Sequence, residues 1–234
     1  MGRGGLKKTS VIVMDYDGTM TQEGGLPDHR VLDKIKYLKD KGILTLVATA
    51  RPYRDIESRF SVVGGLRTYF SALVLELGAV IYLAEEDELI IYKPPCWDTL
   101  IKLLESKVEP ANQGQVLYYF DQTHLDAVRA LNKDLNVCRY NIVKVGSATY
   151  ALVPFGVDKG IGLTRWMKHT KILDAFIISI GDSNSDLPLF RVSNYKGAVG
   201  NASKELKEAA DLVAYKENGE GLIEILKKIE SLLK

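Results

Sequence analysis

The chain has 234 residues, with 31 Lys and Arg against 30 Asp and Glu, and its formal net charge is +1. A balance so close to neutral argues against a general nucleic-acid surface, which needs clustered positive charge, and favours a small ligand that is recognised locally. Hydrophobic residues make up 46% and charged residues 26%, which excludes a disordered or fibrous class. The length allows one large domain, or a medium domain that carries a smaller one.

The two cysteines, Cys96 and Cys138, lie far apart and lack the close spacing of a zinc site. We therefore expect both to be free thiols in a reducing cytosol, and the protein to be cytoplasmic. No apolar run approaches the ~18 residues that a membrane span requires, so we expect no membrane partner.

The first part of the chain alternates short β-branched runs with longer amphipathic segments, the pattern of parallel strands joined by crossover helices. The same pattern returns near the C-terminus. Both parts together predict a Rossmann-like parallel sheet. The expected strands are at residues 10–14, 43–48, 71–75, 175–180 and up to 199, and the expected helices are at 28–41, 53–63, 159–168, after 184 and at 221–233.

The middle of the chain follows a different pattern of short strands and two helices. Strands are expected at residues 89–92, 115–120, 140–145 and 150–153, and helices at 98–106 and 123–135. We interpret this stretch as a smaller α/β domain inserted at residues 84–154, between core parts at 1–83 and 155–234. Both ends of an insertion lie close together, so its two short crossings form a natural hinge.

Two carboxylates, Asp15 and Asp17, follow directly after the apolar run at residues 11–14. Because side chains on a strand repeat with period two, both project to the same side beyond the end of that strand. In an open α/β sheet, this place is the active-site crevice. An exposed acidic turn is the alternative interpretation of the motif in isolation.

Three further motifs are placed to join these acids. Thr49 follows the second predicted strand, and Lys159 begins a helix, where the backbone dipole also favours an anion. Asp182 and Asp186 follow the strand at 175–180. Considered alone, Thr49 is more often a helix cap and Lys159 a solvated charge. Asp15, Thr49 and Asp182, however, each follow a predicted parallel strand, and three such coincidences at one sheet edge favour a common site.

Electrostatics limits what such a site can hold. Two unit charges ~4 Å apart repel by roughly 4 kcal/mol at an effective dielectric of about 20, so the four acids need a cation or partial protonation. Ligands that are all oxygen favour a hard ion, and Mg²⁺ fits best. A calcium-binding EF-hand loop starting at Asp182 is excluded, because Leu187 and Ser193 stand where Gly and Glu are required.

Taken in order, Asp15-Tyr16-Asp17-Gly18-Thr19, Thr49, Lys159 and Gly181-Asp182 resemble the four motifs of haloacid dehalogenase-like phosphohydrolases. The insertion and the sequences at 156–160 and 200–202 are similar to the subgroup with a type II (Cof-type) α/β cap, which includes archaeal phosphoglycolate phosphatases. Three positions depart from that subgroup. Ala50 replaces a frequent Gly, Leu77 a frequent Asn, and Ser185 the usual Asn before Asp186.

The resemblance implies a Mg²⁺-dependent phosphatase of a small phosphorylated metabolite, with phosphoglycolate first and sugar phosphates second. It implies that Asp15 forms an aspartyl-phosphate and that Asp17 is the general acid and base. Thr49 and Lys159 would bind phosphate oxygens. Asn201 would either assist them or cap a helix.

The resemblance also implies the ligands of the metal. Asp15, the Asp17 carbonyl and Asp182 would hold Mg²⁺, with Asp186 in support. Cap residues that are candidate substrate contacts, with core or surface roles as the alternative, are Tyr118, Tyr119, Asp121 and His124.

Two other functions remain open at this point. A phosphomutase on the same scaffold would return the phosphoryl group to a sugar, and a catalytically silent module would bind phosphate ligands without turnover. The sequence leaves the oligomeric state open, a dimer being one option.

Overall fold

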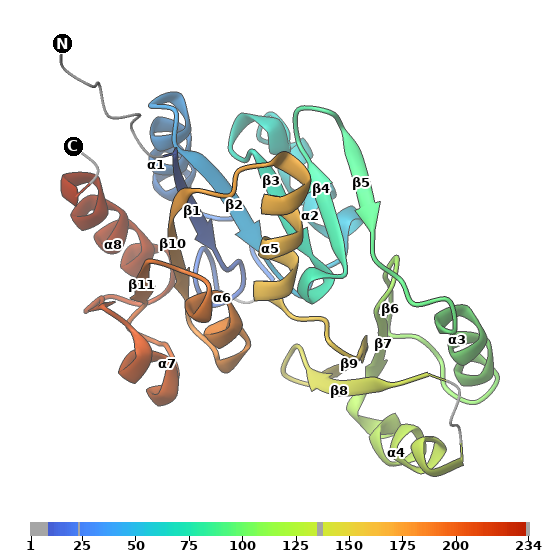
Figure 1. Ribbon diagram of the computed structural model, residues 1–234. Coiled ribbons are helices and arrows are strands. Elements are labelled where there is room, and N and C mark those ends of the chain that lie inside the picture. The colour runs from blue at the N-terminus through green and yellow to red at the C-terminus, as the bar shows by residue number, and fades with distance from the viewer. Residues whose placement is uncertain (1–8, 23, 135–137, 233–234) are drawn as a thin grey trace.

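The computed structural model describes residues 9–22, 24–134 and 138–232, which are organised around two sheets (Figure 1). The large sheet has the order β12-β11-β10-β1-β2-β3-β4-β5. Its strands from β12 to β3 are parallel, and β4 and β5 add an antiparallel edge. These strands are β1 (Thr9–Met14), β2 (Leu44–Ala48), β3 (Ala72–Leu75), β4 (Val80–Leu83), β5 (Glu88–Ile91), β10 (Ala175–Gly181), β11 (Tyr195–Ala198) and β12 (Leu212–Val213).

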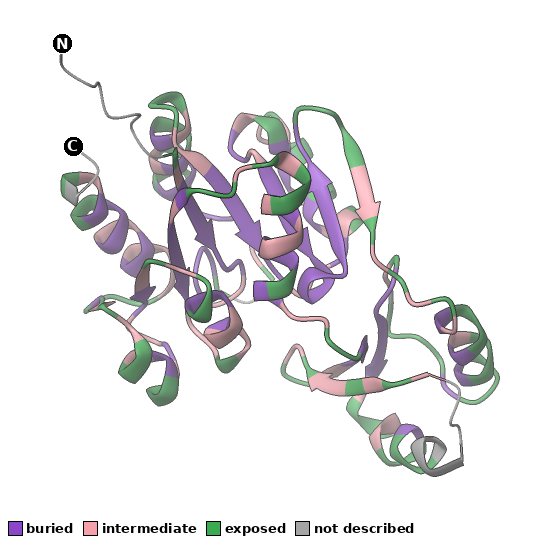
Figure 2. Ribbon diagram, viewed as in Figure 1, coloured by how far each residue is buried: buried purple, intermediate pink, exposed green. Residues whose placement is uncertain are grey.

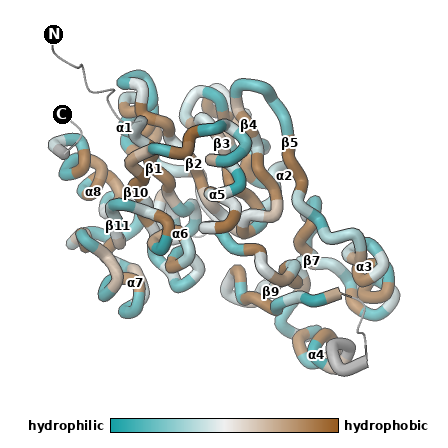
Figure 3. Tube along the Cα trace, in the orientation of Figure 1, coloured by the Kyte–Doolittle hydropathy of each residue, from teal (hydrophilic) through white to brown (hydrophobic). Residues whose placement is uncertain are grey.

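Helices cover both faces of the large sheet, as the alternation of its buried residues requires. Ile12 and Met14 of β1 pack in one cluster with α1, α2 and α8, whereas Val11 and Val13 pack in another with α5 and α6. Figures 2 and 3 show the central strands, β10, β1, β2, β3 and β4, as the mostly buried, apolar centre of this arrangement. The helices are α1 (His29–Asp40), α2 (Tyr53–Ser61), α5 (Lys159–Thr170), α6 (Leu187–Arg191), α7 (Lys204–Ala209) and α8 (Asn218–Leu232).

The second sheet is smaller and antiparallel, with the order β6-β7-β9-β8. Trp97 and Leu100 of α3 and Val128 of α4 are buried in one cluster with Phe120 and Leu152 of this sheet. The expected Rossmann-like core with a smaller α/β insertion is thus confirmed. The elements of the smaller unit are α3 (Trp97–Glu105), β6 (Asn112–Gln113), β7 (Tyr118–Asp121), α4 (Leu125–Asp134), β8 (Tyr140–Lys144) and β9 (Thr149–Pro154).

One predicted strand lies in a different sheet from the one expected. Residues 89–92 were assigned to the insertion, but β5 pairs with β4 as a hairpin of the large sheet. Asp87 takes the left-handed φ of 58° in the turn between them. A short hairpin is a local connection that brings the chain back to the same sheet. The division at residues 84 and 154 stays a prediction, and this pairing favours a later start of the insertion.

The remaining elements are short. Among the described residues, the 3₁₀ turns are η1 (Leu66–Thr68), η2 (Glu76–Gly78), η3 (Gln122–His124) and η4 (Asn184–Asp186). The predicted helix ends at residues 135 and 233 lie outside the described residues. None of the described helices has the length and apolar character needed to cross a membrane.

The prediction of two free thiols is wrong, because Cys96 and Cys138 form a disulfide with their Cα atoms 5.6 Å apart. Cys96 directly precedes α3, and Cys138 lies two residues before β8. The folding of the small unit brings together two residues that are 42 positions apart. Sequence spacing alone carries no signal of such a long-range pair.

Reduction of this disulfide should destabilise the protein. Opening a loop of this length corresponds to about 4 kcal/mol in the chain-entropy model of cross-links. We expect Cys138→Ser and reductant-treated wild-type protein to show the same lowered midpoint of thermal unfolding, with no further effect of reductant on the variant. A wild-type midpoint that does not respond to reductant, together with two titratable thiols before reduction, would contradict the bond.

Candidate active site

The carboxyl ends of three parallel strands place the predicted residues at one edge of the large sheet. Asp15 directly follows β1, Thr49 follows β2 and Asp182 follows β10. The Asp15 N–H continues the ladder by donating to the Ile180 carbonyl at 2.9 Å, and the Thr49 N–H donates to the Val74 carbonyl at 2.9 Å. This edge and the small unit line a common cavity of about 960 Å³, which lies in the range of ~300–1,000 Å³ for small-molecule sites.

Three of the predicted acids converge on a buried lysine. Oxygen atoms of Asp15, Asp182 and Asp186 lie within 4.8 Å of one another. The ammonium of Lys159 donates to Asp15 at 2.7 Å and to Asp186 at 2.6 Å. Lys159 is only 2% exposed, and Asp186 is completely buried. One cation therefore balances only part of the negative charge that is gathered here.

The pKa values of this cluster respond to burial and to the neighbouring charges. Burial, followed by repulsion from Asp186, raises the pKa of Asp15 well above its usual range, although Lys159 opposes the change. Burial also raises the pKa of Asp182, against hydrogen bonds with Asp15 and Thr19. For Lys159, the two carboxylates overcome burial and raise its pKa. A further cation would therefore stabilise the ionised acids.

The residues fit a hard divalent ion. All donors are oxygen atoms, and burial, with repulsion from neighbouring acids, raises the pKa of two of the carboxylates, Asp15 and Asp182. Carboxylates that gather without enough positive charge are typical of a site that is completed by Mg²⁺ with its waters and a substrate phosphate. The group comprises Asp15, Asp182 and Asp186, whereas the Asp17 carboxylate lies in a different contact.

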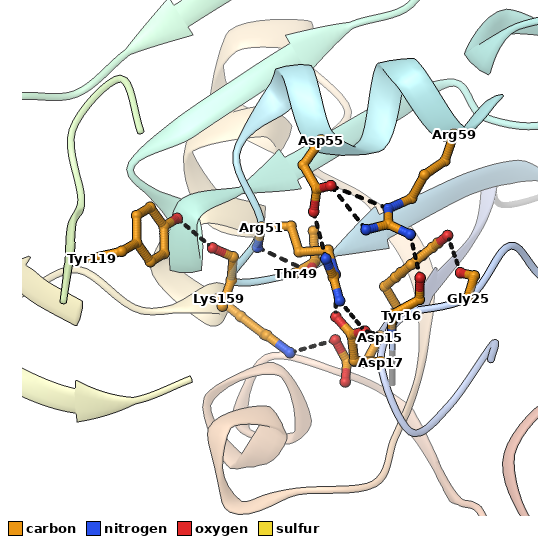
Figure 4. A network of polar contacts seen from close by, with 12 residues as sticks. Asp15, Tyr16, Asp17, Gly25, Thr49, Arg51, Asp55, Arg59, Tyr119 and Lys159 are labelled. Carbon is orange, nitrogen blue, oxygen red and sulfur yellow. Dashed lines mark hydrogen bonds and ion pairs between the residues drawn. The ribbon is translucent and has the colours of Figure 1, made fainter. Parts of the chain in front are cut away.

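Asp17 is held by an arginine that the sequence analysis did not single out (Figure 4). The Arg51 guanidinium donates to both Asp17 oxygens, through Nε at 2.6 Å and through an Nη at 2.7 Å. It also forms an ion pair with Asp55, one helical turn further on, and Asp55 in turn pairs with Arg59. Bidentate contacts of this kind fix a carboxylate in orientation as well as in position.

Gly18 has to be glycine for two reasons. Its φ is +77°, and a Cβ there would lie 2.3 Å from an oxygen of Asp182. The neighbouring Thr19 hydroxyl donates to Asp182 at 3.2 Å. The Asp-x-Asp-Gly-Thr motif therefore brings the backbone at Gly18 against the side chain of Asp182. A larger residue at position 18 would push that side chain away.

Asn201 holds this loop from behind and lies outside the lining of the cavity. Its amide nitrogen donates to the Gly18 carbonyl at 2.8 Å, and its amide oxygen accepts from the Asn218 N–H at 2.7 Å. The cap of α7 is Ser203 rather than Asn201. In this structure, Asn201 supports the loop that carries Asp15 and Asp17.

Asp186 acts as a support at the base of the cluster. Its second oxygen accepts the N–H groups of Asp182 and Ser183, both at 3.1 Å. Ser185, where the resembled subgroup usually has Asn, shares a hydrogen bond of 2.8 Å with the Ser183 hydroxyl. With Ser at residue 185, Asp186 thus accepts both backbone N–H groups.

The Thr49 hydroxyl lies in the cavity lining and accepts the Arg51 N–H at 3.1 Å. Of the four cap candidates, Tyr119 lines the cavity, and its hydroxyl donates to the Ala50 carbonyl at 2.6 Å. The other three, Tyr118, Asp121 and His124, lie outside the lining. Tyr118 donates to the Val108 carbonyl, and Asp121 caps η3.

Glu76 anchors the small unit to the core. Its buried carboxylate accepts three successive N–H groups of the small unit, from Gln115 at 2.7 Å, Val116 at 2.8 Å and Leu117 at 2.7 Å. Burial raises the pKa of Glu76, and these three hydrogen bonds oppose the rise. The residue reaches this position with a left-handed φ of 51°, and Leu77 follows with 55°. Such backbone is costly for residues other than glycine, so the surrounding contacts must maintain it.

Comparisons with known proteins agree with this fold. The sequence model of the family described as haloacid dehalogenase-like hydrolase matches residues 12–103 and 98–226. A protein of Nitrosopumilus maritimus named phosphoglycolate phosphatase is 28% identical over 97% of this chain and 98% of its own length. A protein of Saccharolobus solfataricus named phosphoglycolate phosphatase 2 is 30% identical over 94% of this chain and 92% of its own.

Solved structures share the fold at lower identity. A protein of Thermoplasma acidophilum has a TM-score of 0.76 and 18% identity, covering 97% of this chain and 100% of its own. A haloacid dehalogenase-like hydrolase of Bacteroides thetaiotaomicron has a TM-score of 0.73 and 18% identity, covering 95% and 100%. These similarities support the arrangement of a core with an inserted cap.

Glu76→Gln should loosen the cap from the core. A Gln side chain places an NH₂ group where one carboxylate oxygen now accepts, so at least one buried N–H loses its partner, at a cost of about 1–3 kcal/mol. We expect lower stability in urea and faster hydrogen exchange at the amides of residues 115–117. Glu86→Gln is the matched control, because Glu86 is exposed. Unchanged protection of these amides in Glu76→Gln would contradict the anchor.

Compared with the wild type, Asp182→Asn should be more stable in the absence of Mg²⁺ and less stable in its presence. Without divalent ions, the raised pKa of Asp182 means that its ionisation opposes folding as the pH rises through that pKa. The variant should therefore be more stable than the wild type near neutral pH. The difference should shrink as the pH falls towards the unfolded-state value.

With Mg²⁺ in excess, the wild type gains stability by mass action, about 2.7 kcal/mol at a hundredfold excess over Kd. The variant should gain much less, so that the order reverses. Thermal unfolding of both proteins, in EDTA and in excess Mg²⁺, measures the stability difference under each condition. Equal gains of wild type and variant would place the ion elsewhere.

Proposed function

Because this chain belongs to the haloacid dehalogenase-like hydrolases, we propose that it is a Mg²⁺-dependent phosphatase that hydrolyses a small phosphorylated metabolite through an aspartyl-phosphate. The convergence of Asp15, Asp182 and Lys159 at the carboxyl edge of the large sheet carries this proposal. Phosphoglycolate is the first candidate substrate, since the relatives described above have that name. Sugar phosphates come second.

Asp15 is positioned to be the nucleophile. Its carboxylate lines the cavity at the end of β1 and is fixed by the contact with Lys159. Attack on phosphorus forms an Asp15–phosphate bond while the ester bond to the leaving alcohol breaks. Water then attacks the same phosphorus and releases inorganic phosphate. Two displacements replace one that is more difficult.

Asp17 is the group that moves protons in this scheme. In this proposal one Asp17 oxygen leaves Arg51 and is protonated when the substrate binds. Asp17 gives that proton to the departing alkoxide in the first step and takes one from the attacking water in the second. The bidentate contact with Arg51 orients its carboxylate. Arg51 is thus a positioning residue for Asp17.

Charge stabilisation comes from several groups around the phosphoryl position. In this proposal the Thr49 hydroxyl and the Lys159 ammonium bind phosphate oxygens, and both residues line the cavity. A Mg²⁺ ion held by Asp15, the Asp17 carbonyl and Asp182, with Asp186 in support, would offset the charge of the nucleophile and of the phosphoryl group. The cap that Glu76 and Tyr119 anchor covers the site and limits the access of water to it.

Asp15→Asn should abolish release of phosphate from p-nitrophenyl phosphate, lowering kcat by at least about 10³-fold, because an amide cannot attack phosphorus. Circular dichroism and thermal unfolding should show an intact fold. Glu86→Gln should retain full activity. A variant that turns over at the wild-type rate would refute the mechanism.

Product analysis separates this function from the alternatives. A phosphatase releases free phosphate from its best substrate, and EDTA stops the release until Mg²⁺ is restored. Isomerised sugar phosphate with little free phosphate would identify a phosphomutase. Binding of phosphorylated metabolites without turnover at any metal concentration would identify a binding module.

A further inference from the structure

Lys144 is the basic side chain that the cap contributes to the cavity. The residue ends β8, and the hairpin from β8 to β9 forms most of the cap side of the lining, together with residues 111, 112 and 119. That side contains no acidic residue among the described residues that line the cavity. Its polar members besides Lys144 are Asn112, Tyr119, Ser147 and Thr149.

The three cations that line the cavity differ in how they are paired. Arg51 contacts Asp17 and Asp55, and Lys159 contacts Asp15 and Asp186. Lys144 forms no ion pair with any residue in the described part of the chain, and its side chain is exposed to the cavity. Its charge is therefore available to a ligand.

The direction of the reaction places the leaving group near this lysine. In a displacement at phosphorus, the attacking and leaving oxygens lie roughly in line on opposite sides. The nucleophile Asp15 belongs to the core edge, so the leaving group extends from phosphorus towards the cap. The contacts of Glu76 and Tyr119 hold the cap against that edge and keep the hairpin over the site.

Charge distribution decides what kind of leaving group this position favours. The core side of the cavity carries four acids, Asp15, Asp17, Asp55 and Asp182, against the two cations Arg51 and Lys159, so its excess of negative charge disfavours a second anionic group. The cap side offers one positive charge surrounded by hydroxyl and amide groups. A substrate with a second anion is therefore best accommodated when that anion points to the cap.

We propose that Lys144 binds a carboxylate of the leaving alcohol, so that the preferred substrates are phosphorylated short hydroxy acids rather than neutral sugar phosphates. This inference rests on the proposed phosphatase function and names the class of its substrate. Lys144 is then a specificity-determining residue that contacts the substrate through the carboxylate and takes no part in the transfer of protons.

The experiment compares two esters of similar size. Phosphoglycolate carries the carboxylate, and 2-hydroxyethyl phosphate has a neutral hydroxymethyl group in its place. The value of kcat/KM is measured for both with wild type, Lys144→Met, Lys144→Arg and the control Lys102→Met, in which an exposed lysine of α3 outside the cavity is removed. For each ester, the kcat/KM of a variant is divided by that of the wild type. Differences in leaving-group chemistry between the two esters then cancel.

We expect Lys144→Met to lower kcat/KM for phosphoglycolate by about 10- to 100-fold, the usual effect of losing a hydrogen bond to a charged group. The loss for 2-hydroxyethyl phosphate should stay below about threefold. Lys144→Arg should recover most of the activity on phosphoglycolate, and Lys102→Met should resemble wild type. Because Lys144 is exposed, we expect all variants to fold, and thermal unfolding checks this.

Two results would overturn the inference and leave the proposed function intact. One is equal loss on both esters in Lys144→Met. The other is no loss on either ester while the wild type turns both over, which makes Lys144 a solvated surface charge. Absence of phosphate release from both esters and from p-nitrophenyl phosphate in the wild type with Mg²⁺ would instead reject the proposed function itself.

Discussion

The ammonium of Lys159, buried between the carboxylates of Asp15 and Asp186, is the interaction on which the arrangement of the site depends. It joins the end of β1, the start of α5 and the turn after β10, three segments far apart in the sequence. A buried charge is tolerated only where it is paired and hydrogen-bonded. Three acids around one lysine leave negative charge in excess, and this excess makes the edge suited to a divalent ion and a phosphoryl group.

The cap is attached by contacts that need no cation. Glu76 binds three successive backbone N–H groups, and Tyr119 donates to a backbone carbonyl. Because the partners of Glu76 and Tyr119 are backbone groups, these contacts do not require particular side chains at the partner positions. The left-handed backbone at Glu76 and Leu77 is maintained by these contacts. The disulfide adds a constraint within the cap, because it closes a loop that includes the anchored residues 115–117.

Features that follow from local sequence patterns could be predicted from the sequence. Features that depend on a contact between distant residues could not. Asp15, Thr49 and Asp182 were predictable, because runs of buried strand end just before them and parallel strands end at one edge. The contact of Arg51 with Asp17 spans 34 positions, and that of Glu76 with the cap spans about 40. The periodicity of the sequence contains no signal of contacts between residues so far apart. The same holds for the disulfide, and β5 was misplaced because its hairpin with β4 resembles the entry into an insertion.

One segment of three residues connects the separate parts of the site. Thr49 places its hydroxyl in the cavity, and the carbonyl of Ala50 accepts from Tyr119 of the cap. Arg51 orients Asp17 with its side chain, while its carbonyl accepts the N–H of Glu76, the cap anchor. A displacement of the cap therefore acts on the backbone that carries Arg51. Because the guanidinium holds both oxygens of Asp17, the orientation of the proposed general acid depends on the docked position of the cap.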